Sequence, residues 1–315
     1  MRAFLTGQTQ FDFFRLRVPA YIFSIILVVV SFVGFFTKGL NWGLDFTGGT
    51  YLEVQFQEPA NLPVVRNELK GAGFNDAVVQ LFGTARDVSI RVPTREGVSN
   101  QELGNQIMTA LTASGQKVEM KRVDFVGSVI GKELAEQGGM ALLFVAICML
   151  IYVSIRFQWK LAVGAVLALL HDPIITIGVF AWLQIEVDLT TLAAVLAVLG
   201  YSMNDTIVVF DRMRENFRKV RSGTPKDIMN LSTNQTLSRT TMTSGLTLVT
   251  VLALFFFGGP MLHSFSTALL VGILVGTYSS IYVAAAVALA FKLSREDLLP
   301  AVVEKEGADQ QSMLP

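Results

Sequence analysis

Residues 161–183 read LAVGAVLALLHDPIITIGVFAWL, and residues 189–210 read LTTLAAVLAVLGYSMNDTIVVF, with only QIEVD (184–188) between them. A helix needs about 20 predominantly apolar residues to cross about 30 Å of hydrocarbon. Each of the two runs therefore predicts a transmembrane helix. Together they place the chain among membrane proteins, and they contain ionisable side chains whose positions call for an explanation.

Four further runs are equally long and apolar, at about 19–37, 138–155, 240–259 and 264–291. The first is longer than a signal-peptide core and lacks a small-residue cleavage site, so we expect a retained anchor. Only 16% of the 315 residues are charged, whereas a soluble domain has about 25%. The formal net charge of zero gives no basic field for nucleic acid. The sequence predicts a six-helix polytopic membrane protein.

The distribution of Lys and Arg predicts the orientation of these helices. Cations are abundant before the first span, between the second and third spans and after the fourth, whereas 184–188 and 259–263 have none. Both termini are therefore expected in the cytoplasm and the large segment on the periplasmic side. The expected divisions are a cytoplasmic N-terminus (1–18), the first helix (19–37), a periplasmic domain (38–137), helices two to six (138–292) with a basic cytoplasmic loop (211–238), and a disordered cytoplasmic tail (293–315).

The segment between the first two spans has the pattern of a small α+β domain. Alternating residues predict strands at 51–57, 77–82, 87–92 and 117–125, and helical patterns occupy 61–71 and 99–113. The order β-α-β-β-α-β predicts a ferredoxin-like fold. That fold says little about activity. Gly48 and Gly49 are expected only to permit a tight exit from the first span.

Signs of enzyme or metal chemistry are missing from the sequence. Residues 127–133 resemble a phosphate-binding loop but have too few residues between the glycines and no hydroxyl for magnesium, so an interfacial helix is preferred. His171 and His263 lie on different segments, without metal-ligand spacing. Cys148 is expected to be a small hydrophobic core residue. We therefore expect no catalytic residues, no metal and no cofactor.

The informative residues are the ionisable ones inside the spans: His171, Asp172, Asp205 and Arg239. Such residues are costly in lipid, and they commonly mark ion or substrate paths. Asp205 and Arg239 enter from the same side on consecutive helices, so they are expected at similar depth. A carboxyl group between desolvation and a nearby cation can load and release a proton. A static ion pair explains the same residues equally well.

Asp172 is deeper and precedes Pro173, which tends to kink a helix. We rank this carboxyl below Asp205 as a second proton site, and the adjacent His171 lower still.

Two helical stripes complete the pattern. Thr236, Arg239, Thr243, Thr247 and Thr250 share one face of the fifth span. This stripe predicts a wet path or a polar interhelical seam, although each hydroxyl could instead bond to its own helix.

The sixth span has a small residue at every fourth position, at Ala268, Gly272, Gly276, Ser280, Ala284 and Ala288. That spacing predicts a seam for a closely packed helix of this chain or of another chain.

Three motifs give the chain a family resemblance. LDFTGGT (44–50) after the first span, GYSMNDTIVVFDRMRE (200–215) in the fourth and TLSRT (236–240) in the fifth resemble those of the SecD/SecF family. With the six-span layout, the resemblance covers nearly the whole chain except the tail, and it is to the smaller of the family's two subunits. It implies half of a transporter of the resistance-nodulation-division superfamily.

The resemblance also implies a function. Such a subunit pairs with SecD and uses the proton-motive force to help exported polypeptides leave SecYEG on the periplasmic side of the bacterial inner membrane. YajC and YidC are further partners it implies. The family's proton-pathway residues match Asp205 and Arg239 here, and we extend the pathway to Asn204, Thr243, Thr247 and Asp172. SecD carries a comparable aspartate, so the relay in this chain is incomplete. Pro173 departs from the valine expected in the family.

Two other functions remain open. A half-size proton-coupled exporter of lipids or small molecules would need a roomy apolar pocket in the periplasmic domain. A non-transporting scaffold of a channel would tolerate changes at Asp205 and Arg239 but not at Gly272 or Gly276.

Overall fold

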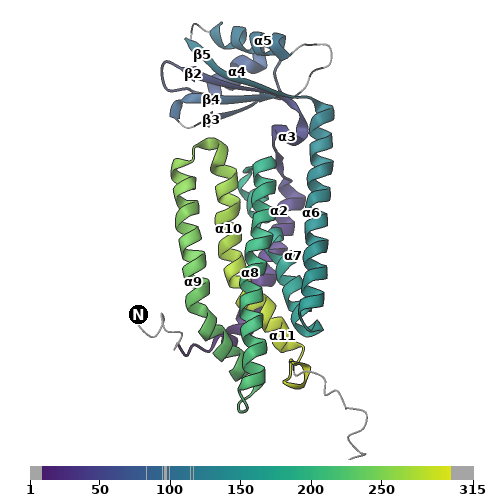
Figure 1. Ribbon diagram of the computed structural model, residues 1–315. Coiled ribbons are helices and arrows are strands. Elements are labelled where there is room, and N and C mark those ends of the chain that lie inside the picture. The colour runs from purple at the N-terminus through teal and green to yellow at the C-terminus, as the bar shows by residue number, and fades with distance from the viewer. Residues whose placement is uncertain are drawn as a thin grey trace, which may run out of the picture.

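The computed structural model describes residues 9–298 except 83, 94, 96, 97, 99, 114 and 116. The prediction of a disordered tail at 293–315 is wrong for residues 293–298, because Leu293 and Leu298 are buried and Asp297 pairs with Lys160 over 2.6 Å. From 299 onward the predicted tail lies outside the described residues. The chain forms two layers: a bundle of long helices and a small α+β domain at one end of it (Figure 1). The first and last described segments, at Phe13–Leu16 and Glu296–Leu298, lie at the other end of the bundle.

Six helices in the described part of the chain are long and apolar enough to cross a membrane, which confirms the predicted architecture. They are α2 (Arg17–Lys38, preceded by the 3₁₀ turn Phe13–Leu16), α6 (Ser128–Arg156), α7 (Trp159–Leu183), α8 (Leu189–Lys219), α9 (Pro225–Phe257) and α10 (His263–Ser279), the last continued by a π-helical turn (Ser280–Ala285) and α11 (Ala286–Ala290). Short 3₁₀ turns occupy Pro260–Leu262 and Glu296–Leu298.

The prediction of a loop at 211–238 is wrong, because almost all of this segment is helical. Helix α8 continues to Lys219 and α9 begins at Pro225. Thr224 and Asp227 form a capping box that starts α9. These extensions pack through buried apolar side chains, listed here: Met213, Phe217, Ile228 and Met229, together with Phe14. Hydropathy falls where the helices leave lipid, but tertiary packing maintains the helix beyond that point.

The domain at the end of the bundle, called the head domain here, spans Gly49–Val126. Its elements are β2 (Gly49–Phe56), α4 (Leu62–Gly71), β3 (Val78–Phe82), β4 (Thr84–Val92), α5 (Asn100–Thr112) and β5 (Val118–Val126). The sheet order is β3-β4-β2-β5 and every pair is antiparallel. This is the ferredoxin-like topology that the pattern predicts. The apolar faces of α4 and α5 cover one side of the sheet in a closed core that includes Leu52, Val65, Ile90 and Ile107.

A compact junction joins the head domain to the bundle. After α2, the chain forms β1 (Asn41–Trp42) and the one-turn helix α3 (Leu44–Thr47), and β1 pairs in parallel with β6 (Glu186–Val187) between α7 and α8. Gly48 and Gly49 then turn the chain into β2 with positive φ angles of 69° and 135°. A Cβ atom at Gly49 would meet the Val92 carbonyl, so both backbone conformation and space require glycine there.

Candidate functional site

The centre of the bundle contains buried polar side chains on α7, α8, α9 and α10. Asp205 of α8 is 2% exposed. Its Oδ2 accepts a long hydrogen bond of 3.4 Å from Ser244 Oγ of α9, and Ser244 shares a 2.9 Å bond with Thr277 Oγ1 of α10. Asp205 is thus attached weakly to a network that joins three helices. The hydroxyl of Thr240, one turn from Ser244 on α9, is buried without a hydrogen-bond partner.

Arg239 lies close enough to Asp205 for their charges to interact. Its side chain is nevertheless exposed, and among the described residues it forms no ion pair, whether with Asp205 or with another carboxylate. Asn204, next to Asp205 on α8, is exposed as well. The static ion pair that the sequence left open is therefore not formed in this chain, and one side of the Asp205 site is lined by polar groups at the bundle surface.

The threonine stripe of α9 lies mainly on that same surface. Thr243 and Thr250 are exposed and Thr247 is half-buried. Each of these hydroxyls donates to a carbonyl four residues earlier in its own helix, over 2.8–3.1 Å. These hydroxyls therefore bond to the backbone of their own helix, which is the alternative to a wet path or polar seam. They do not form a continuous series of hydrogen bonds with one another.

Asp172 of α7 is bound much more firmly. It is 0% exposed, and its Oδ2 accepts from Ser202 Oγ of α8 and, over 2.8 Å, from Ser279 Oγ of α10. Its Oδ1 lies 2.8 Å from His171 Nδ1. The Nε2 atom of His171 is buried without a hydrogen-bond partner, and this ring lies beside that of Tyr278. Asp172 therefore ties α7, α8 and α10 together.

The small residues of α10 let the neighbouring helices approach closely. A Cβ atom at Gly272 would overlap Val198 of α8, and one at Gly276 would come within 3.0 Å of Ser202. Farther along the same span, Ala284 packs against Gly164 of α7, while buried Ser280 donates to the Thr277 carbonyl. The helices opposite this seam belong to the same chain. This packing brings Ser279 to Asp172 and Thr277 to Ser244, the hydrogen-bond partner of Asp205.

Sequence reasoning missed the serines. Ser202, Ser244 and Ser279 supply hydrogen bonds to Asp172 or Asp205, but serine is common in membrane helices and its usual partner is its own backbone. The only signal for Ser279 was its position next to Ser280 of the small-residue seam. Pro173 lies inside α7, which runs unbroken from Trp159 to Leu183.

Cys148 is exposed on α6, so the prediction that it is a core residue is wrong. Helix α6 is the least covered of the six spans, and an apolar sequence in a membrane does not distinguish core from lipid-facing positions. Among the described residues there is no cluster of three His, Cys, Asp or Glu side chains able to hold a metal.

Fold and site together define a class: a multi-pass membrane protein with buried carboxyl groups between tightly packed helices and one ferredoxin-like head domain. Residues 106–294 match the family "Protein export membrane protein SecD/SecF, C-terminal", and residues 33–60 match the SecD/SecF GG motif. The chain belongs to the SecD/SecF family, as its motifs predict.

Similar proteins include two translocase subunits. The protein translocase subunit SecF of Vibrio alginolyticus is 57% identical over 310 residues, which cover 98% of this chain and 98% of that protein. The SecF subunit of Escherichia coli O157:H7 is 48% identical over 311 residues, covering 98% and 96%.

Solved structures of SecDF share the fold. The crystal structure of SecDF, a translocon-associated membrane protein from Thermus thermophilus, gives a TM-score of 0.82 at 37% identity, covering 91% of this chain. SecDF in a super-membrane-facing form gives 0.68 at 37% identity over 90% of this chain. The chain spans only 39% of each of these longer proteins.

Proposed function

We propose that this chain is one half of a proton-driven protein-export machine. It works with a SecD-type subunit in the bacterial inner membrane and helps exported polypeptides leave SecYEG on the periplasmic side. Both termini are cytoplasmic and the head domain is periplasmic. The names of the relatives support the export role. The SecDF proteins, in which this chain matches 39% of the length, support a partner of SecD type. YajC and YidC are further candidate partners, and neither an enzymatic activity nor a cofactor is required.

The observation that carries the proposal is the uneven environment of Asp205. The carboxyl group is 2% exposed, yet it has one long hydrogen bond and a nearby cation that is not paired with it. Burial favours the neutral acid and the cation favours the carboxylate. A modest shift of α9 relative to α8 changes that balance, so proton uptake and release can be linked to helix movement.

The surface position of Arg239 and Asn204 supports a partner subunit. A guanidinium facing hydrocarbon costs about 2.5–3.5 kcal/mol on insertion scales, so this face of α8 and α9 requires a polar neighbour. A SecD-type subunit that contributes its own aspartate there would complete the path. Thr243 and Thr247 belong to the same path, with Asp172 as a deeper site.

The gradient supplies enough free energy for this coupling. One proton provides about 2.3 kcal/mol per 100 mV of potential and about 1.4 kcal/mol per unit of pH difference. The sum biases a two-state movement by tens- to hundreds-fold. The junction around β1 and β6 lies between α8 and the head domain, which supports the head domain as the part that moves.

The test is Asp205→Asn in inverted membrane vesicles supplied with ATP. We expect the gradient-dependent part of export to fall about tenfold or more, the change that a loss of about 1.4 kcal/mol produces. The matched control is Asp211→Asn on the same helix, where Asp211 forms an exposed ion pair with Arg156. Unchanged gradient-dependent export in Asp205→Asn would overturn the proton role.

The competing functions make different predictions. An exporter of lipids or small molecules would need a pocket in the head domain, but the head-domain core is closed. The apolar cavity of about 240 Å³ is lined mainly by membrane helices. A scaffold that does not transport would keep full export when Asp205 or Arg239 is replaced and would lose its assembly when Gly272 or Gly276 is replaced.

A further inference from the structure

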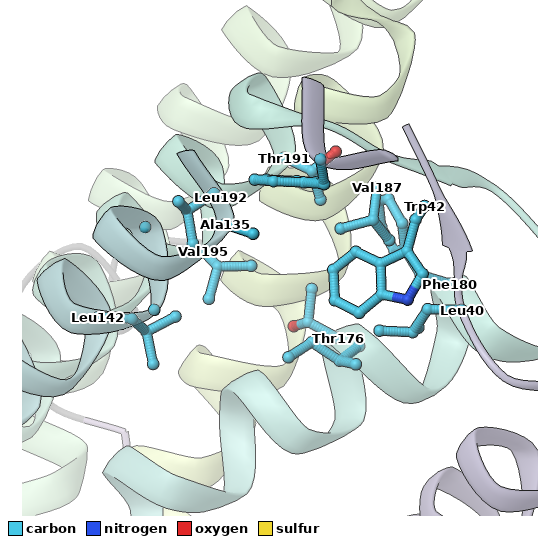
Figure 2. Close-up of a pocket in the computed structure, with 14 residues that line it drawn as sticks. Leu40, Trp42, Ala135, Leu142, Thr176, Phe180, Val187, Thr191, Leu192 and Val195 are labelled. Carbon is cyan, nitrogen blue, oxygen red and sulfur yellow. The ribbon is translucent and has the colours of Figure 1, made fainter. Parts of the chain in front are cut away.

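An apolar cavity of about 240 Å³ lies in the bundle directly below the head domain. Its walls come from α6, α7 and α8, and Trp42 and Phe46 of the segment between α2 and β2, called the roof here, also line it. Figure 2 shows Trp42 at one side of the cavity. It is separate from the carboxyl groups described above. Ala135 and Gly139 of α6 line it and are exposed, so the cavity opens to the outside of the bundle along α6.

The cavity lining is almost wholly apolar and offers few polar groups to water. The hydroxyls that line it belong to Thr176 and Thr191, and both are used elsewhere. Thr176 Oγ1 donates to the Asp172 carbonyl over 2.8 Å, and Thr191 Oγ1 donates to Asp188 Oδ1 over 2.8 Å. Water needs two to four polar partners in such a site, whereas an engineered apolar cavity of about 150 Å³ stays dry and binds benzene. This cavity therefore suits an apolar occupant.

A membrane offers one abundant apolar occupant at this depth, the acyl chain of a phospholipid. The mouth has no side-chain barrier, because a Cβ atom at Gly139 would meet nothing within 4 Å. Leu192 and Val195 of α8 lie beside Ala135 and Leu142 of α6, and Trp42 and Phe180 lie across the cavity from them (Figure 2). An acyl chain entering beside Gly139 would restore the dispersion contacts that the cavity walls otherwise lack.

Charged side chains above the mouth match a zwitterionic headgroup. Lys132 lies on α6 one turn before Ala135, and helical side chains tilt toward the N-terminus, here toward the head-domain end. Lys132 and Glu136 are both exposed, and neither forms a hydrogen bond or ion pair within the described part of the chain. Glu133, by contrast, accepts from Gln137. A free cation and a free carboxylate one turn apart complement the phosphate and the ammonium of phosphatidylethanolamine.

We propose that this cavity binds one acyl chain of a phosphatidylethanolamine molecule from the leaflet next to the head domain, with its phosphate at Lys132 and its ammonium at Glu136. The site is distinct from the proposed proton path. Figure 1 shows α6 and α9 at opposite edges of the bundle, so the lipid site does not include the exposed polar surface of α9. The lipid fills the space between the roof residues and α8.

The test is photocrosslinking of the full chain with its partner subunit in vesicles of phosphatidylethanolamine and phosphatidylglycerol. Trace phosphatidylethanolamine carries a diazirine on its acyl chain, and adducts are mapped by mass spectrometry. We expect adducts on the cavity residues Leu142, Leu192 and Val195, at about fivefold the level on the lipid-facing Leu143 and Phe144. Equal labelling of cavity and lipid-facing residues means ordinary boundary lipid, and it overturns the proposal.

Ala135→Phe fills the cavity mouth and should lower cavity labelling about fivefold or more. The matched control is Ala141→Phe, on an exposed position of α6 outside the lining, which should leave labelling unchanged. Gly139→Leu is a second filling variant in case Ala135→Phe folds poorly. Full labelling in both filling variants, with unchanged melting temperature, contradicts the proposal.

The headgroup assignment has its own readout. Wild-type protein should be labelled about fivefold more by phosphatidylethanolamine than by phosphatidylglycerol with the same acyl probe, a preference of the size expected for one charged group near the membrane surface. Glu136→Gln should abolish this preference, and Lys132→Gln should lower labelling by both lipids. Lys292→Gln, beyond α11 at the other end of the bundle, is the control. Equal labelling of wild type by the two lipids overturns the assignment.

Discussion

Two buried carboxyl groups occupy the same bundle but are held very differently. Asp172 is fixed by side chains from α7, α8 and α10, whereas Asp205 has one long bond to Ser244. A group with several donors from separate helices cannot change its partners without moving those helices. Asp205 can. This contrast favours Asp205 as the proton-carrying group and assigns Asp172 mainly to holding the helices in register.

The Asp172 cluster predicts a stability difference between adjacent serines. Ser279→Ala removes a 2.8 Å hydrogen bond to Asp172 and should cost about 1–3 kcal/mol of stability, because the acceptor remains buried. Ser280→Ala removes only a bond to its own helix and should cost clearly less. Thermal unfolding of the two purified variants in detergent measures the difference. Equal melting temperatures would contradict the assignment.

Close helix packing predicts opposite effects for two glycines. A Cβ atom at Gly164 would overlap the Ala284 carbonyl. Backbone cannot rotate away as a side chain can, so Gly164→Ala should cost about 1–3 kcal/mol through overpacking. At Gly245 in α9 a Cβ atom meets nothing within 4 Å, so alanine there should stabilise by up to about 1 kcal/mol through helix propensity. Melting temperatures in detergent measure both variants, and a Gly164→Ala variant as stable as wild type contradicts the packing argument.

The elements of the fold were predictable to different degrees. Six spans follow from hydropathy, and the head-domain order follows from alternation along 51–57 and the helical pattern of 61–71. The helical extensions around Phe217 and Ile228 could not be predicted from hydropathy, because hydropathy measures transfer into lipid and not helix formation. The π-helical turn at Ser280–Ala285 was not predictable either, because small residues at every fourth position are equally compatible with an α-helix.

The candidate site was predictable in composition but not in geometry. Asp205 and Arg239 could be singled out because charge inside a span is costly. Their lack of an ion pair depends on the rotation of α9, which places Arg239 at the surface and Ser244 toward Asp205. The sequence of one subunit does not contain the surface that would cover Arg239, so no pattern within it could settle that rotation.

The whole molecule is linked through the start of α8, the helix that carries Asp205. Asp45 of α3 accepts from the Leu189 backbone amide over 3.0 Å, which caps α8 with a residue from the segment leading into the head domain. Arg91 of β4 pairs with Glu186 of β6 over 2.7 Å. These contacts give a movement of α8 along its axis a direct route to the sheet of the head domain.

This junction predicts a pH dependence that Glu186→Gln should reduce. Burial raises the pKa of Glu186 above its usual 4.5, and Arg91 offsets this only in part. In the unfolded chain the carboxyl group loses its proton near its usual pKa, whereas the folded protein retains the proton to higher pH. The stabilising contribution is therefore full at lower pH and is lost as pH rises through the folded-state pKa.

The wild-type melting temperature, measured from pH 4 to pH 8, should accordingly include a decline that Glu186→Gln lacks, because the amide does not titrate and can still accept from Arg91. Glu119→Gln is the matched control, since Glu119 is an exposed head-domain carboxylate paired with Lys121. Hydrogen exchange at residues 184–192 measures the same effect locally, with faster exchange at high pH, after correction for the intrinsic rate, in wild type only. If Glu186→Gln follows the wild-type pH profile, the stability of the junction does not depend on the titration of this carboxyl group, and the argument from its raised pKa is wrong.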